Sequence, residues 1–212
     1  MIISEDFILE VAGQYFTLLP QKALFWQQQK ALLLADVHAG KASHFRKNGI
    51  PLSTDLLLND LNKIEMLLKK TCASKLIILG DLFHSSSNIE NTLVESWVDG
   101  LSVSTELVLG NHDIHSLANS RIPTKLPYVL DGILLSHEPA ESEHFNIHGH
   151  LHPAFTLAGK ARNHLKLPAY YINKQSITLP AFGSTTGQRM YAELCKNSKI
   201  ILVTDDGLLA AN

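Results

Sequence analysis

The stretch LIILGDLFH, residues 76–84, decides the fold, because it joins a short apolar run to a turn that carries polar side chains. Three further stretches have the same form: ALLLADVH (31–38), ELVLGNHD (106–113) and GILLSH (132–137). Each is apolar without strict alternation and is bounded by polar residues, which is typical of fully buried central strands. The four stretches therefore predict the centre of a β-sheet.

Helical patterns lie between these strands. From 53 to 70, apolar side chains recur at helical spacing, and Ser53 or Thr54 could serve as the N-cap. A second helix is expected from about 88 to 98, where apolar positions again recur at three and four. Strands that alternate with helices predict an α/β sheet with crossover connections.

The chain shows no repeat, low-complexity tract or linker, so we expect one domain, 1–212. Segments 1–30 and roughly 176–208 are hairpin-like and predict added antiparallel or mixed strands. The net charge of -2 gives no argument for nucleic acid binding, which would need a local basic surface. Two distant cysteines, an acidic N-terminus and no long apolar run predict a reduced, soluble, cytoplasmic protein without a signal peptide.

Each apolar stretch ends in residues that bind metals. These residues are Asp36 and His38, then Asp81 with His84, then Asn111, His112 and Asp113, then His137, and a fifth segment adds His150 and His152. Ligands bind beyond the carboxyl ends of strands in α/β sheets, so we expect these side chains on one side of one sheet. The i, i+2 spacing of Asp-x-His and His-x-His suits an extended backbone, and the preceding glycines suit tight turns.

The donor types indicate the kind of metal. Carboxylate oxygen, imidazole nitrogen and amide oxygen together favour borderline divalent ions such as Mn, Fe or Zn over Ca or a thiolate site. Two such ions about 3.5–4 Å apart can clamp the attacking and leaving oxygens of an in-line displacement. One of these motifs alone is more often a structural turn, but five in this order indicate a two-metal site.

The order DxH…GD…GNHD…H…GHxH resembles the calcineurin-like metallophosphoesterase superfamily from about Leu32 to Pro153. The resemblance implies an α/β fold in which two mixed β-sheets pack as a sandwich flanked by helices. It implies that one metal ion is held by Asp36, His38, Asp81 and His152. It implies a second ion held by Asp81, Asn111, His137 and His150, with Asp81 bridging. His112 matches the family's catalytic histidine, and Asp113 matches the residue that would orient it.

Two further resemblances concern the substrate. GDLFH resembles repair nucleases of the SbcD type, in which the histidine that matches His84 assists DNA cleavage; the alternative is a merely polar neighbour of the site. HAGK (38–41), HFRKNGIP (44–51), LSHEP, HGHLHP and LPAFGSTTG resemble the bacterial ligase-associated phosphoesterase family, PdeM. That resemblance implies a DNA repair phosphoesterase or endonuclease that acts with an ATP-dependent DNA ligase, a helicase and an exonuclease.

Local charge adds modest support. Lys41, His44 and Arg46 follow the first metal motif and are candidates for binding the substrate, although solvated surface residues are the plain alternative. From 144 to 192 the chain has no acidic residue, and its basic residues there are Lys160, Arg162, Lys166, Lys174 and Arg189. Tyr170 and Tyr171 could stack on bases, but buried strand aromatics are the simpler interpretation.

Three functions remain open. The chain could be a nuclease or DNA 3′-end phosphoesterase, a phosphatase or phosphodiesterase for a small molecule or nucleotide, or an inactive metal-bound scaffold for repair partners. The complete ligand set and His112 argue against the scaffold.

Overall fold

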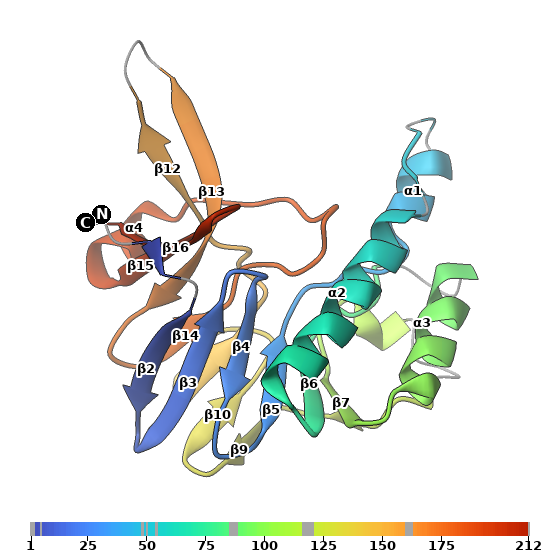
Figure 1. Ribbon diagram of the computed structural model, residues 1–212, viewed down its shortest axis with the longest axis horizontal. Helices are drawn as coiled ribbons and strands as arrows, with labels where there is room; N and C mark the ends of the chain where they lie inside the picture. Colours follow the sequence, from blue (N-terminus) through green and yellow to red (C-terminus); the bar gives the residue numbers. More distant parts are fainter. Residues whose placement is uncertain are drawn as a thin grey trace.

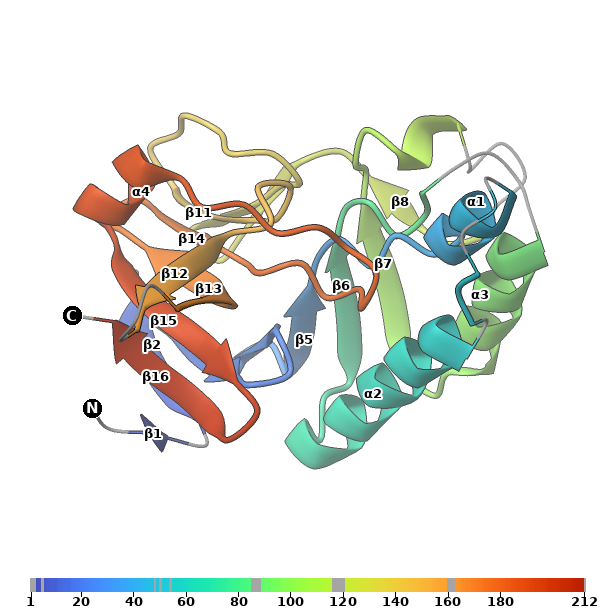
Figure 2. The same ribbon diagram turned by 90° about the horizontal axis from the view of Figure 1, so that it is seen from above.

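The computed structural model describes residues 3–4, 6–47, 49, 51–53, 55–84, 89–115, 121–159 and 163–211. The chain forms two β-sheets that pack face to face, and most of the helices lie on the outer face of one of them (Figures 1 and 2). The fold is thus the expected α/β arrangement of two mixed sheets with few helices.

The first sheet has seven strands in the order β2-β3-β4-β5-β6-β7-β8. Its strands are β2 Phe7–Val11, β3 Gln14–Leu19, β4 Ala23–Trp26, β5 Ala31–Leu34, β6 Lys75–Leu79, β7 Ser104–Val108 and β8 Thr124–Lys125. The β2–β5 half is antiparallel and the β5–β8 half is parallel. The crossovers between the parallel strands contain the helices α1 Lys41–Lys47, α2 Asp55–Thr71 and α3 Ile89–Gly100 and the short 3-10 helix η1 Asp113–His115.

The second sheet has nine strands, eight of them in the order β1-β16-β15-β13-β14-β11-β10-β9, while β12 pairs with β13 outside this path. Its strands are β1 Ile3–Ser4, β9 Tyr128–Leu130, β10 Ile133–Leu135, β11 Phe145–His148, β12 Ala154–Ala158, β13 His164–Ile172, β14 Ser176–Thr178, β15 Lys199–Thr204 and β16 Gly207–Ala211. Strands β10, β11 and β14 are parallel, and the other pairs are antiparallel. Helix α4 Ala192–Asn197 precedes β15.

The central strands bury both of their faces. In β5, Leu33 packs into the core between the two sheets, whereas Leu32 and Leu34 pack under α2 and α3. A strand covered on both sides needs apolar residues at every position, which explains the continuous run in the sequence. A third cluster packs the outer face of β13 and β15 against α4.

The four apolar stretches form the expected strands, but the expectation of one sheet was wrong. β5, β6 and β7 lie in the seven-stranded sheet, while β10 pairs with β9 and β11 in the other sheet. An apolar run shows that a strand is buried but not which sheet it joins, since strands of both sheets face the same core.

The helix expected over 53–70 is α2, and Oγ of Ser53 accepts a hydrogen bond from the backbone N–H of Asp55 at 3.1 Å. The second expected helix is α3, although Asn88, like Thr54, falls outside the described residues. None of the described helices is long and apolar enough to cross a membrane.

Candidate metal centre

Five turns meet at one edge of the two sheets. Three of them follow β5, β6 and β7, and two follow β10 and β11. Each turn comes after the carboxyl end of a parallel strand, where α/β proteins place their ligands. The turns carry the seven side chains predicted as metal ligands: Asp36, His38, Asp81, Asn111, His137, His150 and His152.

One group of these side chains lies where the turns after β5 and β11 meet. Nε2 of His38 is 3.3 Å from Nε2 of His152, which is 3.2 Å from Oδ1 of Asp36. Nε2 of His38 is also 3.8 Å from Oδ2 of Asp81. These four residues are the set that the family resemblance assigns to the first metal ion.

A second group lies around His137. Its Nε2 is 3.3 Å from Oδ2 of Asp81, 3.1 Å from Oδ1 of Asn111 and 3.1 Å from Nδ1 of His150. This is the set assigned to the second ion. Oδ2 of Asp81 belongs to both groups, so the carboxylate lies where a bridging ligand is expected.

The donor atoms fit divalent cations. Nδ1–H of His137 donates to the carbonyl oxygen of Leu79 at 3.0 Å, which leaves the Nε2 lone pair for a metal. Asp36 is fully buried, and its Oδ2 accepts a hydrogen bond from the N–H of His150 at 3.0 Å. Its Oδ1 accepts no hydrogen bond within the described part of the chain. A buried carboxylate oxygen without a donor is costly, and a bound cation removes that cost.

The protein charges in the centre also favour cations. Burial opposes a charge on His137, but the hydrogen bond and charge of Asp81 and the charge of Asp36 outweigh burial and raise the pKa of His137 to about 9. Burial would also raise the pKa of Asp81, yet the hydrogen bond from His137 keeps that pKa below its usual value. The buried carboxylates therefore attract positive charge, which two divalent ions would supply.

The backbone at the ligands is not extended, contrary to the expectation for Asp-x-His and His-x-His. Five of the ten non-glycine residues with positive φ in the described part of the chain are predicted ligands. They are Asp36 (φ 57), His38 (φ 51), Asp81 (φ 52), His150 (φ 66) and His152 (φ 47). Left-handed residues turn the chain sharply, so both members of each pair reach the centre from a compact turn. Such strain is kept where the surrounding structure enforces it, typically at functional sites.

The glycines that precede the ligands are needed mainly because any side chain at these positions would clash with a neighbouring turn, and less because of their backbone conformation. A Cβ at Gly80 would overlap the ring of His137, and one at Gly110 would overlap the carboxylate of Asp81. A Cβ at Gly149 would overlap Asp36. Gly80 alone of the three has a positive φ, +79°. Each glycine thus lets one turn approach a ligand of another.

Asp113 has contacts that differ from the prediction. Its buried carboxylate accepts hydrogen bonds from the backbone N–H groups of Asp81 (2.8 Å), Phe83 (3.0 Å) and Gly110 (3.0 Å). Asp113 therefore braces the turn after β6, and these contacts do not orient the His112 ring. Burial raises the pKa of Asp113 to about 6, although the three amides oppose this shift.

His112 is oriented by the turn after β6. Its Nδ1–H donates to the carbonyl oxygen of His84 at 3.2 Å, and its backbone N–H donates to Oδ1 of Asp81 at 3.0 Å. Its Nε2 lies 4.0 Å from Oδ2 of Asp81. The rings of His84 and His112 stack with centroids 5.2 Å apart, and the His38 ring lies edge-on 5.3 Å from that of His112. The His84 ring thus lies beside those of His38 and His112, while its role in cleavage stays a prediction.

A loop that sequence reasoning gave no role fixes the turn of Asp36. The N–H of Gly183 donates to the carbonyl oxygen of Asp36 at 3.1 Å, and a Cβ at Gly183 would overlap the carbonyl of Val37. The loop is held by the buried carboxylate of Asp60, which accepts hydrogen bonds from the N–H (2.8 Å) and hydroxyl of Ser184. In the sequence this loop is LPAFGSTTG, a stretch that resembles the ligase-associated family but contains no predicted ligand or catalytic residue.

The predicted substrate-binding residues have different surroundings. Lys41 begins α1, and burial lowers its pKa. The guanidinium of Arg46 is 2.6 Å from Glu90 and also donates to the Leu52 carbonyl, so it ties α1 to α3 instead of pointing freely at a substrate. His44 lies in α1, but its side chain is outside the described part.

The tyrosines are buried strand residues and do not stack on bases. The hydroxyl of Tyr170 donates to the carbonyl oxygens of Leu19 and Ala23, and that of Tyr171 donates to the carbonyl oxygen of Ala154. His148 is buried as well, and burial lowers its pKa to about 4. Lys160 and Arg162 lie outside the described residues.

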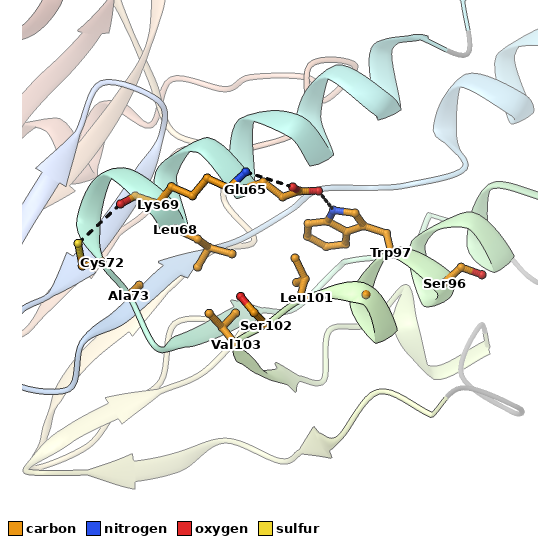
Figure 3. Close-up of a pocket in the computed structure, with 11 residues that line it drawn as sticks. Glu65, Leu68, Lys69, Cys72, Ala73, Ser96, Trp97, Leu101, Ser102 and Val103 are labelled. Atoms are coloured by element: carbon orange, nitrogen blue, oxygen red, sulfur yellow. Dashed lines mark hydrogen bonds and ion pairs between the residues drawn. The ribbon is translucent and has the colours of Figure 1, made fainter.

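An apolar cavity of 420 Å³ lies away from this centre, between α2 and α3 (Figure 3). The indole of Trp97 forms one side, and its Nε1–H donates to Glu65 at 2.9 Å. Leu68, Leu101 and Val103 are among the other residues that line it.

Comparisons with known proteins identify a family and two solved structures to which the chain is similar. The Pseudomonas putida nuclease MPE superposes with a TM-score of 0.81 and 31% sequence identity over 97% of this chain and 100% of that chain. The E. coli phosphoesterase YfcE gives a TM-score of 0.43 and 16% identity over 84% and 90% of the two chains. No curated protein matches the chain by sequence. The family model described as calcineurin-like phosphoesterase matches residues 30–203, and the chain therefore belongs to that family of metal-dependent hydrolases.

Proposed function

We propose that this protein hydrolyses phosphodiester bonds in DNA, as an endonuclease or a 3′-end phosphoesterase in ligase-associated DNA repair. The observation that carries the proposal is the meeting of two ligand groups at Oδ2 of Asp81, which lies 3.8 Å from Nε2 of His38 in one group and 3.3 Å from Nε2 of His137 in the other. Nε2 of His112 is 4.0 Å from the same atom. Resemblance to a protein named as a nuclease, over nearly the whole chain, supports DNA over a small substrate.

Two divalent ions would occupy the centre, and manganese fits the donors as well as iron or zinc does. Asp36, His38, Asp81 and His152 would hold one ion, and Asp81, Asn111, His137 and His150 would hold the other. Bound ions of this kind neutralise phosphate charge and lower the pKa of an attacking water. The protein's part is to fix the ligands, which it does through the strained turns and their backbone hydrogen bonds.

His112 would act on the leaving oxygen or on the charge of the transition state. Because its Nδ1–H is committed to the carbonyl of His84, Nε2 is the atom that can present a proton to the substrate. The side chain is 40% exposed, so a bulky phosphodiester can reach it. The His84 ring, stacked on that of His112, would flank the same phosphate.

The cellular setting follows from the family resemblance. An ATP-dependent DNA ligase, a helicase and an exonuclease are the partners that such an enzyme would have in the cytoplasm. A ligase requires clean DNA ends, which a phosphoesterase or nuclease can supply.

A metal-replete assay tests the proposal. The protein, loaded with manganese, is offered single-stranded DNA, duplex ends, duplexes with 3′-phosphates, small nucleotides and bis(4-nitrophenyl) phosphate. We expect cleavage of at least one DNA substrate as well as the aryl diester. Cleavage of small nucleotides without any attack on DNA would overturn the repair function and favour a small-molecule phosphodiesterase. Failure on every substrate, with two metal ions bound, would favour the inactive scaffold.

A further inference from the structure

A two-stranded ribbon projects from the metal-centre edge of the molecule. β12 pairs with β13 outside the main path of the nine-stranded sheet, and the two strands stand out from the body in Figure 1. Five residue pairs join the strands, from Ala154 opposite Pro168 to Ala158 opposite His164. At about 3.3 Å per residue, the paired part is about 16 Å long.

The register gives the ribbon two different faces. Directly paired residues share a face and alternate along each strand. Phe155 pairs with Leu167 and Leu157 with Leu165, so one face is apolar. Phe155, Leu157 and Leu167 pack into the cluster that contains residues of α4, which covers the inner part of this face.

The other face, called the polar face below, holds Thr156, Lys166 and His164 beside the small or apolar residues Ala154, Ala158 and Pro168. Thr156 pairs with Lys166, and His164 lies at the outer end of the same face. The chain has no acidic residue from 144 to 192, so no carboxylate side chain of the two strands offsets the charge of Lys166. The ribbon thus has an apolar face that packs against the body and, on its opposite side, a face whose charge among the described residues comes from Lys166.

The polar face lies on the side of the metal centre. The Lys166 ammonium donates a hydrogen bond to the carbonyl oxygen of Gln188. The next residue, Arg189, donates its N–H to the carbonyl of His152 at 2.9 Å and accepts from the N–H of Ala154 at 2.8 Å. The segment 188–189, which Lys166 contacts, is thus hydrogen-bonded directly to the backbone of His152, a predicted metal ligand. Lys166 is exposed and keeps two further N–H donors.

We propose that this polar face, with Lys166 at its centre, is an arm that binds the phosphate backbone of duplex DNA and holds it beside the metal centre. The assignment rests on the proposed function, because it assumes that DNA is the substrate. A two-stranded ribbon fits the major groove of B-DNA, and lysine neutralises phosphates. The described residues of the polar face offer no aromatic ring except the His164 imidazole for stacking on unpaired bases, which favours a duplex over a single strand.

The test compares charge reversals on and off the arm in the manganese-loaded, full-length protein. Lys166→Glu should raise the Kd and KM for a fluorescein-labelled duplex about three- to tenfold, and Lys166→Ala should lower the slope of log Kd against log salt by about one. Hydrolysis of bis(4-nitrophenyl) phosphate should not change, since that substrate is too small to reach the arm. Thr156→Glu, on the same face, should weaken duplex binding as well.

Lys174→Glu is the matched control, because Lys174 is exposed and lies beyond the opposite end of β13. It should leave duplex binding within about twofold of the wild type. Unchanged duplex binding in both Lys166→Glu and Thr156→Glu would overturn the proposed arm. So would a loss of binding to single-stranded DNA alone, or a loss of aryl diester hydrolysis as large as the loss of duplex binding. A wild type that hydrolyses the aryl diester but neither binds nor cleaves DNA would instead refute the proposed function.

Discussion

The two ends of the seven-stranded sheet carry contrasting surfaces. At the carboxyl ends of β5, β6 and β7, buried carboxylates and imidazoles are held by left-handed turns and backbone amides. At the other end, the residues just before β6 and β7 line an apolar cavity between two ordinary helices (Figure 3). Five left-handed ligand residues and the buried carboxylates Asp36 and Asp81 lie at the first surface, whereas Cys72 (φ 51) is left-handed at the second. The concentration of buried carboxylates and imidazoles at the first surface indicates that the chemistry resides there.

The largest expected effect is from the residue shared by both ligand groups. Asp81→Asn should remove most bound metal and reduce turnover below detection, because an amide brings no charge to two cations. Metal content by mass spectrometry and hydrolysis of an aryl diester measure this. Asp55→Asn, on the exposed start of α2, is the matched control. Two retained ions in Asp81→Asn would contradict the bridging role.

The next effect separates catalysis from metal binding. His112→Ala should lower kcat by about 10²–10⁴-fold, the usual contribution of general acid catalysis, with metal content unchanged. The control is His144→Ala, which removes an imidazole from the opposite, amino-terminal end of β11. Equal loss of metal and turnover would assign His112 to the ligand set instead.

A smaller effect is expected from the support of the Asp36 turn. Asp60→Asn should weaken manganese binding about 10–100-fold, which is the usual effect of losing a group that supports a metal ligand. The reason is that Asp60 binds Ser184 and so holds the loop that hydrogen-bonds to the Asp36 turn. Ser184→Ala should have a similar effect, and the double variant should lose little more than either single one. Additive losses would show that Asp60 and Ser184 act separately.

The smallest effect on turnover is expected at the far cavity. Trp97→Ala should lower the free energy of unfolding by about 2 kcal/mol, since the half-buried indole packs against the helix core. Its kcat/KM and metal content should match the wild type. Urea unfolding and the aryl diester assay measure the two quantities. If Trp97→Ala lost turnover and metal together, the cavity end of the sheet would also support the metal centre, and the contrast between the two ends of the sheet would not hold.

Much of the metal centre was readable from the sequence because ligands cluster at strand ends. LIILGDLFH shows both a buried strand and the polar turn after it, and the ordered set of five such segments predicted which side chains would meet. The conformation of the turns was not readable, because a pattern of i, i+2 ligands fits an extended and a left-handed backbone equally well. The contacts of Asp113 and Arg46 were also missed, since their partners are backbone amides and a glutamate far along the chain.

The sequence by itself determined the central strands, α2 and α3, the seven candidate ligands and the family resemblance, because each depends on local order and composition. Only the tertiary structure decided that β10 joins a second sheet, that Asp60 and Ser184 support the Asp36 turn, and that Lys166 of the β12–β13 ribbon lies near the segment bonded to His152. These features depend on the pairing of strands and on contacts between distant segments. Such contacts form when the two sheets close on a shared core, and no local pattern encodes them.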